Sequence, residues 1–235
     1  MEPPGYVTLS RQAGLMREMQ VVAHNIANLS TTGFRREGVV FSEYVKRQPG
    51  GESLSMAHGN ARHVDLGQAG VSQTGGTFDF AIQGDGFFLV QTPEGERLTR
   101  AGAFTPSPEG ELMTPDGHRL LDQGGSPVFV PPGSKVALAQ DGSLSADGVP
   151  LTRIGLWQPS DPLSLRHQAG TLFAADAVEP AEGGVMLQGF LEDSNVEPVS
   201  EIARMIEVQR AYEMGQSFLD REDERMRGVI DTLGR

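Results

Sequence analysis

An apolar residue recurs at every seventh position through the C-terminal segment from Asn195 to Leu233. The repeat consists of Met205, Tyr212, Leu219, Met226 and Leu233. On a helix with about 3.6 residues per turn, such a repeat produces a seam that a second helix must cover. The seam is expected to be completed by Ile202, Gln209, Gln216, Asp223 and Ile230. Because polar seam positions specify register and partner number, this segment predicts a long helix with specified neighbours.

Capping chemistry marks the start of this helix. Ser194 and Glu197 form the Ser-x-x-Glu pattern of a capping box, and Pro198 falls in the first turn, where no amide hydrogen bond is lost. The sequence therefore predicts a helix over residues 195–233.

A matching apolar stripe lies near the other end of the chain. It consists of Leu15, Met19, Val22, Ile26 and Leu29, spaced alternately by four and three residues. This helix is expected to begin near Tyr6 and to end before Gly33, whose missing side chain suits a left-handed C-terminal position. It carries Arg11 and Arg17, whereas residues 195–235 hold nine carboxylates and six arginines. Complementary charge favours pairing of the two helices. The alternative is that each stripe simply faces a compact core, as amphipathic helices usually do.

The residues after the N-terminal helix are typical of a helix that unravels into a turn. We expect Asn25, Asn28, Thr31, Thr32 and Gly33 to shape this helix exit. An extended or loosely helical arm is predicted to follow as far as residue 45. Residues 46–76 are poor in apolar side chains, and we interpret them as a linker with one or two short strands.

From residue 77 to residue 189 the apolar period changes to two. Phe78, Phe80 and Ile82 alternate with polar residues, and Gly-containing turns such as Asp116-Gly117 and Asp141-Gly142 follow at short intervals. This pattern predicts an antiparallel β-domain of barrel or sandwich type. The fold class is therefore α+β, with long terminal helices forming a coiled-coil-like α-domain (residues 1–45 and 190–235) and an inserted all-β domain. Such a helical stalk exposes a seam that one molecule cannot cover, which predicts assembly.

Composition excludes several classes of function. A net charge of −12 over 235 residues argues against nucleic acid as the main ligand. The absence of cysteine excludes disulfides and thiolate metal sites. No apolar run is long enough to predict a transmembrane segment. The N-terminus lacks the pattern of a Sec-type signal peptide, so we expect a cytoplasmic protein or one exported without a cleaved signal.

Catalytic and metal-binding patterns are missing from the sequence. The histidines are scattered without ligand spacing, and no Gly-x-Ser-x-Gly elbow occurs. We therefore predict no enzyme activity, no metal and no cofactor. Trp157, Phe87 and Phe88 are compatible with a sugar-stacking platform, although aromatic residues on alternating strands are more often part of the core.

Three sequence blocks resemble the bacterial flagellar rod and hook proteins. Residues 21–35 (VVAHNIANLSTTGFR) resemble the N-terminal signature of that family. Residues 82–89 (IQGDGFFL) and 98–104 (LTRAGAF) are similar to the start of its β-domain. Residues 191–199 (LEDSNVEPV) and 205–213 (MIEVQRAYE) resemble its C-terminal motif. The blocks occur in family order and span nearly the whole chain. The chain departs from the family at His24, where asparagine is usual, and in a more charged segment from Ser217 to Arg227.

The resemblance implies a structural subunit of the basal-body rod, of the proximal-rod branch, with the distal-rod branch as the alternative. It implies export by the flagellar type III apparatus into the periplasm and partners that are copies of the chain and neighbouring rod proteins. It also implies that the terminal helices form an inner α-domain of a tubular rod, with residues 77–189 outside.

On this basis we expect a self-assembling axial protein whose terminal helices form the assembly interface. The interface residues are Leu15, Met19, Val22, Ile26, Leu29, Ile202, Met205, Tyr212, Leu219, Met226, Ile230 and Leu233. A competing interpretation from a different class is a surface β-domain that binds glycan or peptidoglycan.

Overall fold

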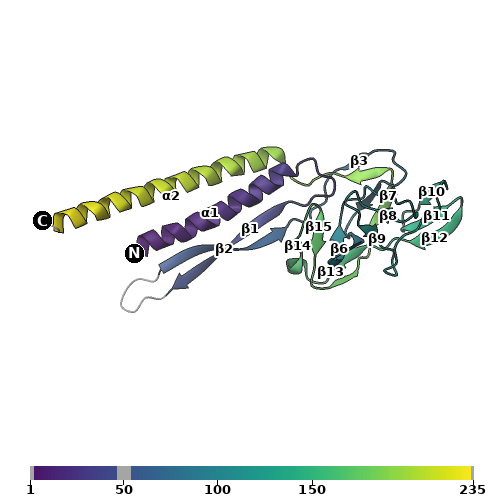
Figure 1. Ribbon diagram of the computed structural model, residues 1–235, viewed down its shortest axis with the longest axis horizontal. Helices are drawn as coiled ribbons and strands as arrows, with labels where there is room; N and C mark the ends of the chain where they lie inside the picture. Colours follow the sequence, from purple (N-terminus) through teal and green to yellow (C-terminus); the bar gives the residue numbers. More distant parts are fainter. Residues whose placement is uncertain (1–2, 47–53, 234–235) are drawn as a thin grey trace. The chain divides into compact units, whose positions relative to one another are not determined.

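The chain folds into two compact units of different composition. The computed structural model describes the backbone of residues 3–46 and 54–233, and the side chains of residues 8–40 and 62–232. The helical unit consists of Met1–Ala27, Glu37–His63 and Glu197–Arg235, and the β-unit consists of Asn28–Arg36 and Val64–Val196. The two helices and the antiparallel strands confirm the predicted α+β class (Figure 1).

The helical unit contains two helices and a strand pair. Its elements are α1 (Pro3–Ala27), β1 (Glu37–Lys46), β2 (Leu54–Val64) and α2 (Pro198–Leu233). β1 pairs with β2 in a two-stranded sheet. α1 packs against both α2 and β1, and Figure 1 shows α1 lying alongside α2. The segments interpreted as an arm and a linker therefore contain two long strands, while residues 47–53 of that linker lie outside the described residues.

The start of each helix differs by three residues from its predicted position. α2 begins at Pro198 and not at Asn195, and the expected capping box does not form. The Ser194 hydroxyl accepts a hydrogen bond from the Val196 amide instead (3.3 Å). α1 begins at Pro3 rather than near Tyr6 and ends at Ala27, before Gly33 as predicted. Residues 28–36 then lead into β1, so Gly33 lies beyond the last turn of the helix.

The β-unit is built from many short strands. They are β3 (Val71–Gln73), β4 (Phe80–Gln83), β5 (Phe88–Thr92), β6 (Gly95–Thr99), β7 (Thr105–Pro106), β8 (Leu112–Met113), β9 (Arg119–Leu120), β10 (Val136–Leu138), β11 (Ser143–Ala146), β12 (Val149–Arg153), β13 (Trp157–Pro159), β14 (Arg166–His167), β15 (Leu172–Ala174), β16 (Val178–Pro180), β17 (Val185–Gln188) and β18 (Phe190–Glu192). A 3₁₀ turn, Pro162–Ser164, precedes β14.

The sheets of the β-unit are antiparallel and open. The largest has the strand order β14-β15-β6-β5-β9-β8-β7, and its two edge strands are not paired with each other. Smaller sheets are β10-β11-β12, β13-β16, β17-β4 and β18-β3. The predicted antiparallel strands are confirmed. No sheet among the described strands closes into a barrel.

Glycine turns connect these strands as the sequence predicted. Gly95 closes the β5–β6 hairpin with φ +111°, and Gly142 precedes β11 with φ +88°. A Cβ at Gly142 would lie 2.4 Å from the carbonyl oxygen of Ile154. Both the left-handed backbone and the close approach therefore require glycine at this position.

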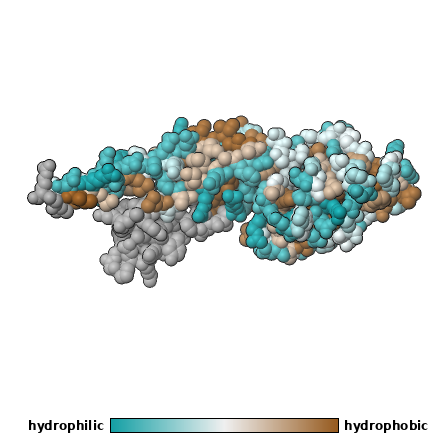
Figure 2. Space-filling view, in the orientation of Figure 1, coloured by the Kyte–Doolittle hydropathy of each residue, from teal (hydrophilic) through white to brown (hydrophobic). Residues whose placement is uncertain are grey.

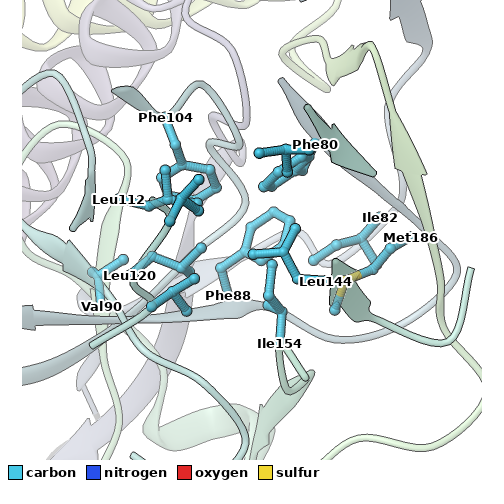
Figure 3. Packing of buried hydrophobic residues seen from close by; sticks show 13 residues of the cluster. Phe80, Ile82, Phe88, Val90, Phe104, Leu112, Leu120, Leu144, Ile154 and Met186 are labelled. Atoms are coloured by element: carbon cyan, nitrogen blue, oxygen red, sulfur yellow. The ribbon is translucent and has the colours of Figure 1, made fainter. Parts of the chain in front are cut away.

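β5 separates two apolar clusters because both of its faces are covered. Phe88 and Val90 face one cluster, shown in Figure 3, which also contains Phe80, Phe104, Leu112, Leu120, Leu144 and Ile154. The Phe88 and Phe104 rings meet edge to face, with centroids 5.4 Å apart. Phe87 and Leu89 face the second cluster with Leu98 and Phe173. The continuous apolar run from Phe87 to Val90 is explained by this two-sided burial.

Candidate assembly interface

Polar contacts fix the antiparallel pairing of α1 and α2. The Gln12 side-chain amide donates to the carbonyl oxygen of Tyr212 (2.9 Å), and the Arg204 Nε donates to Glu18 Oε1 (2.6 Å). Near the other end of α1, the Asn25 amide donates to Glu201 Oε2 (3.3 Å). Residue numbers rise along one helix as they fall along the other, so these contacts set the register.

The face of α2 that packs within the helical unit follows a four-three spacing. Its buried or partly buried residues are Glu201, Met205, Val208, Tyr212, Gly215 and Leu219, and Ala211 beside them is also partly buried. Met205, Tyr212 and Leu219 belong to the seven-residue repeat identified in the sequence. The second column of the seam differs from the expectation by one residue, since Glu201 is 1% exposed and Ile202 is 51% exposed.

The remaining predicted interface residues occupy different environments. On α1, Val22 is buried, while Leu15, Met19 and Ile26 are partly buried. Leu29 is partly buried in the β-unit, beyond the end of α1. Met226 and Ile230 are exposed on α2, and the side chain of Leu233 lies outside the described residues.

Asn25 joins the last turn of α1 to the start of β1. Its Oδ1 accepts a hydrogen bond from the Glu37 amide (3.0 Å), and its Nδ2 donates to the Glu37 carbonyl oxygen (2.9 Å). The side-chain amide thus pairs with both backbone groups of one residue, as a neighbouring strand would. With the additional bond to Glu201, one buried side chain connects α1, β1 and α2.

The neighbouring His24 lies on the half-exposed side of this junction. Its Nδ1 is 3.2 Å from Glu37 Oε2, and Arg62 approaches the same carboxylate oxygen at 3.7 Å. The residue that departs from the family pattern is therefore accommodated by a polar contact at the helix surface.

The other helix-exit residues belong to the β-unit. The Thr31 hydroxyl donates to Asn28 Oδ1 (3.1 Å), and the Thr31 amide donates to the Asn28 carbonyl oxygen (3.2 Å). Thr32 is partly buried. Gly33 has φ +70°, and its amide donates to the Glu192 carbonyl oxygen (2.8 Å). A Cβ there would lie 2.3 Å from the Ala101 nitrogen, so close backbone approach explains this glycine.

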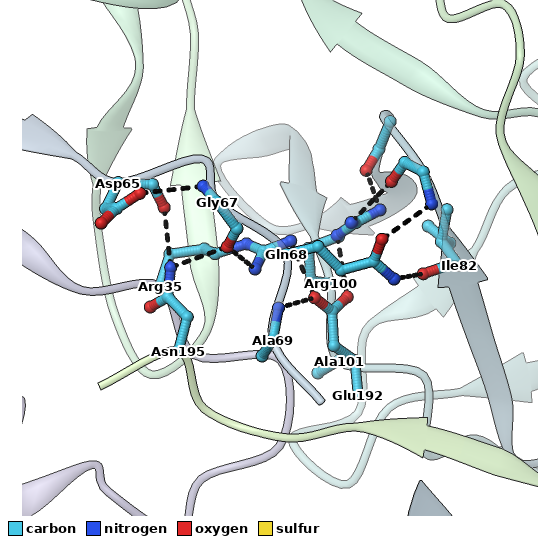
Figure 4. A network of polar contacts seen from close by, with 12 residues as sticks. Arg35, Asp65, Gly67, Gln68, Ala69, Ile82, Arg100, Ala101, Glu192 and Asn195 are labelled. Carbon is cyan, nitrogen blue, oxygen red and sulfur yellow. Dashed lines mark hydrogen bonds and ion pairs between the residues drawn. The ribbon is translucent and has the colours of Figure 1, made fainter. Parts of the chain in front are cut away.

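A buried ion cluster, not anticipated from the sequence, lies beside this turn (Figure 4). Arg35 approaches Glu192 Oε1 and Arg100 approaches Glu192 Oε2, each at 2.9 Å. The side chains of all three residues are at most 2% exposed. Burial lowers the pKa of Arg100 to about 10, and the charge of Glu192 opposes that shift. Burial also lowers the pKa of Arg35, again against the attraction of Glu192.

Backbone carbonyl groups accept further hydrogen bonds from these two arginines. Arg35 donates to the Gly67 carbonyl oxygen (2.6 Å), and Arg100 donates to those of Gly86 (2.6 Å) and Gly84 (2.8 Å). The Asn195 side chain likewise accepts from the Arg36 amide (2.6 Å). The segments by which the chain enters and leaves the β-unit are therefore held together by charge-assisted hydrogen bonds.

Apolar side chains are exposed along the outward face of α2. Val199 is 74% exposed, Ile206 45%, Met214 66% and Phe218 41%. Figure 2 shows apolar surface gathered over the N-terminal half of this helix. Aligned exposed apolar residues on a helix face indicate a surface that binds another protein.

The alternative of a sugar-stacking platform is not favoured, since two of its three aromatic residues lie in the core, as the strand pattern indicated. Phe87 and Phe88 are 5% and 0% exposed and belong to the two apolar clusters, because β5 is covered on both faces. Trp157 alone is partly exposed, beside a pocket of about 610 Å³ in the β-unit. Within the described part of the chain, no group of three or more acidic, histidine or cysteine side chains is arranged to hold a metal. No helix among the described residues is long and apolar enough to span a bilayer.

Comparison with known proteins relates the chain to a family of axial proteins. Residues 187–232 match the family model for the C-terminal region of the flagellar basal-body rod proteins FlgE, FlgF and FlgG, and residues 81–148 match that for the D1 domain of the hook protein family FlgE/F/G. The flagellar basal-body rod protein FlgF of Caulobacter vibrioides is 38% identical, with 98% of this chain and 97% of that protein covered. FlgF of Mesorhizobium japonicum is 37% identical (100% and 99% covered), and FlgG of Bacillus subtilis is 29% identical (96% and 97% covered).

Proposed function

The chain belongs to the FlgE/F/G family of flagellar rod and hook proteins, and we propose that it is a structural subunit of the basal-body rod, of the FlgF type. The similarity to FlgF proteins extends through both terminal helices and the β-unit, and identity to the FlgG relative is lower. The proposed role is mechanical, so it requires no catalytic group and no cofactor.

The exposed apolar face of α2 is the observation that carries the proposal. Residues Met205, Tyr212 and Leu219 pack inward within the helical unit, while Ile202 and Ile206 remain exposed. A helix with apolar residues on two sides needs neighbours on both. The four-three spacing of the inward face supports a coiled-coil-like α-domain, to which other subunits add their helices.

We assign the predicted interface residues to two roles. Leu15, Met19, Val22 and Ile26 hold the helix pair of one subunit together, with Leu29 at its junction with the β-unit. Ile202, Met226 and Ile230 contact other subunits, because they are exposed within one chain. Polar residues in the seam then restrict which neighbours can pack and in what register.

The proposed partners are copies of this chain, neighbouring rod proteins and the flagellar type III export apparatus. The proposed location is the rod of the flagellar basal body in the periplasm, where the helical unit makes the contacts between subunits. Contacts between different faces of identical subunits extend into open, tubular assemblies rather than closing into dimers.

Substitution of Leu219 tests the proposed function. Leu219→Asp places a charge in the partly buried seam, so rods should not form, while the β-unit should remain folded. The measurements are recovery of basal bodies from the bacterium and near-ultraviolet circular dichroism, which reports on Trp157 in the β-unit. Val149→Asp, at a 63% exposed position of β12, is the matched control. Intact rods that contain the Leu219→Asp protein would contradict the assignment.

The competing glycan-binding function is not favoured. Of the three aromatic side chains that are compatible with a platform, two lie in the core. A saturable change in Trp157 fluorescence on addition of muropeptides would be required to restore it.

A further inference from the structure

A groove of about 350 Å³ opens on one side of the helix pair. It is lined by Thr8, Arg11, Gln12 and Leu15 of α1 and by Ala211, Met214, Gly215 and Phe218 of α2. The small residues Ala211 and Gly215 are four positions apart and therefore lie on one face of α2. Small residues at such a spacing allow another helix to approach closely, while Met214 and Phe218 supply apolar walls.

The C-terminal end of α2 extends beyond α1. Gln12 contacts Tyr212, and Thr8 lines the same groove as Phe218. Because the helices are antiparallel and α1 begins at Pro3, the last three turns or so of α2 have no part of α1 beside them. Figure 1 shows this projecting end. We call Glu222–Leu233 the overhang. Its side chains Met226, Val229 and Ile230 are 39%, 48% and 68% exposed and share one helix face.

The overhang cannot fill the groove of its own chain. Phe218 and Ile230 are twelve residues apart on one straight helix, a separation of about 18 Å along the axis. The overhang and the groove of one chain cannot contact each other. A second copy of the chain can cover them, because it offers a groove for the overhang and an overhang for the groove. Because the overhang and the groove are different surfaces, each added copy leaves one overhang and one groove free at the ends of the assembly.

We propose that the overhang of one copy docks in the groove of a second copy, with Met226, Val229 and Ile230 against Leu15, Met214 and Phe218. This inference rests on the proposed self-assembling function and specifies which surfaces meet. Charge supports the pairing. The groove carries Arg11, whereas the overhang carries Glu222, Asp223, Glu224 and Asp231 against Arg225 and Arg227. Opposite net charge favours this encounter and disfavours overhang-to-overhang contact.

Cysteine cross-linking tests the proposal directly, because the chain contains no cysteine. We would prepare the full-length Met214→Cys and Ile230→Cys proteins, both substituted at positions more than 60% exposed. Each protein alone and an equal mixture would be treated with a short bis-maleimide. The expected result is a covalent dimer in the mixture, about tenfold or more above either protein alone. Within the mixture, Arg11→Glu in the Met214→Cys protein should reduce the yield.

Controls separate this inference from the proposed function. Val149→Cys, 63% exposed in the β-unit, should give no dimer with either partner. Equal dimer yields from Met214→Cys alone, or no dimer in the mixture at any concentration, would overturn the overhang-in-groove contact. Recovery of the same variants in basal bodies would show that the rod function stands even then. If neither these variants nor the unsubstituted protein were found in basal bodies, the proposed rod function itself would be overturned.

Discussion

The two units of this protein differ in how much of their apolar surface is buried within one chain. In the β-unit, Phe80, Phe88 and Phe173 are fully buried, and the large apolar residues that remain exposed, such as Val149 and Leu163, are scattered. In the helical unit, exposed apolar residues align along α2, while Glu18 and Glu201 are buried. The β-unit thus completes its core within one chain, whereas the helical unit keeps an apolar face for other molecules.

The ion pairs of the two units also differ in how far they are shielded from water. In the β-unit, the Arg35–Glu192–Arg100 cluster is almost completely shielded from water. In the helical unit, the Arg204 side chain that pairs with Glu18 is 49% exposed. A shielded cluster is strongly coupled to folding, while a half-exposed ion pair contributes little. The contrast predicts that substitutions in the β-unit act on folding and that many in the helical unit act on assembly.

The largest effect is expected from Phe88→Ala. This residue is 0% exposed and packs edge to face against Phe104, so its truncation should destabilise the β-unit by about 3–5 kcal/mol. Urea denaturation followed by Trp157 fluorescence measures the change. An unchanged midpoint would show that the β-unit tolerates a cavity and would remove the contrast between the units.

A slightly smaller loss is expected from Glu192→Gln. The substitution removes the carboxylate that two buried guanidinium groups share. It should cost about 3 kcal/mol, since the glutamine oxygen can still accept hydrogen bonds. Thermal unfolding of the variant would be compared with that of Glu182→Gln, an exposed position in the same unit. Equal melting temperatures would mean that the cluster does not stabilise the fold.

Asn25→Ala should weaken the helical unit selectively. It removes three hydrogen bonds at a buried position and leaves the Glu37 amide without its acceptor, at a cost of about 2 kcal/mol. Hydrogen exchange at the Glu37 amide should accelerate, while amides of β5 keep their protection. Gln20→Ala, exposed on α1, serves as the control. Acceleration throughout β5 would indicate that the two units unfold together.

The smallest effect on the isolated protein is expected at the outward face of α2. Ile202→Ala should change stability by no more than about 0.5 kcal/mol, because the side chain is 51% exposed. Its matched variant, Val208→Ala, should cost about 2 kcal/mol, since Val208 is 2% exposed. Circular dichroism at rising temperature distinguishes them. If both variants unfold alike, the inward and outward faces of α2 have been misassigned.

Local patterns in the sequence predicted much of the secondary structure. The seven-residue repeat through Met205, Tyr212 and Leu219 predicted the long C-terminal helix, and the Gly-containing turns predicted the antiparallel strands. These features depend on backbone periodicity and on the conformational freedom of glycine, which neighbouring residues determine. An extended or loosely helical arm and a linker with one or two short strands were predicted where β1 and β2 lie, but not the length or the pairing of these strands, because their sequences lack a clear apolar alternation.

Other features depended on the tertiary structure alone. A repeat gives the period of a helix but not which of two neighbouring columns of residues faces a partner. Glu201 and Gly215 face inward because Asn25 and Gln12 of α1 lie beside them. Glu192 lies far from Arg35 and Arg100 in the sequence, and a buried charge is tolerated only where the fold brings its partner. The sequence by itself determined the α+β class, the two long helices and the family. The choice of which residues are buried between elements was made by three-dimensional packing, because that choice depends on partners distant along the chain.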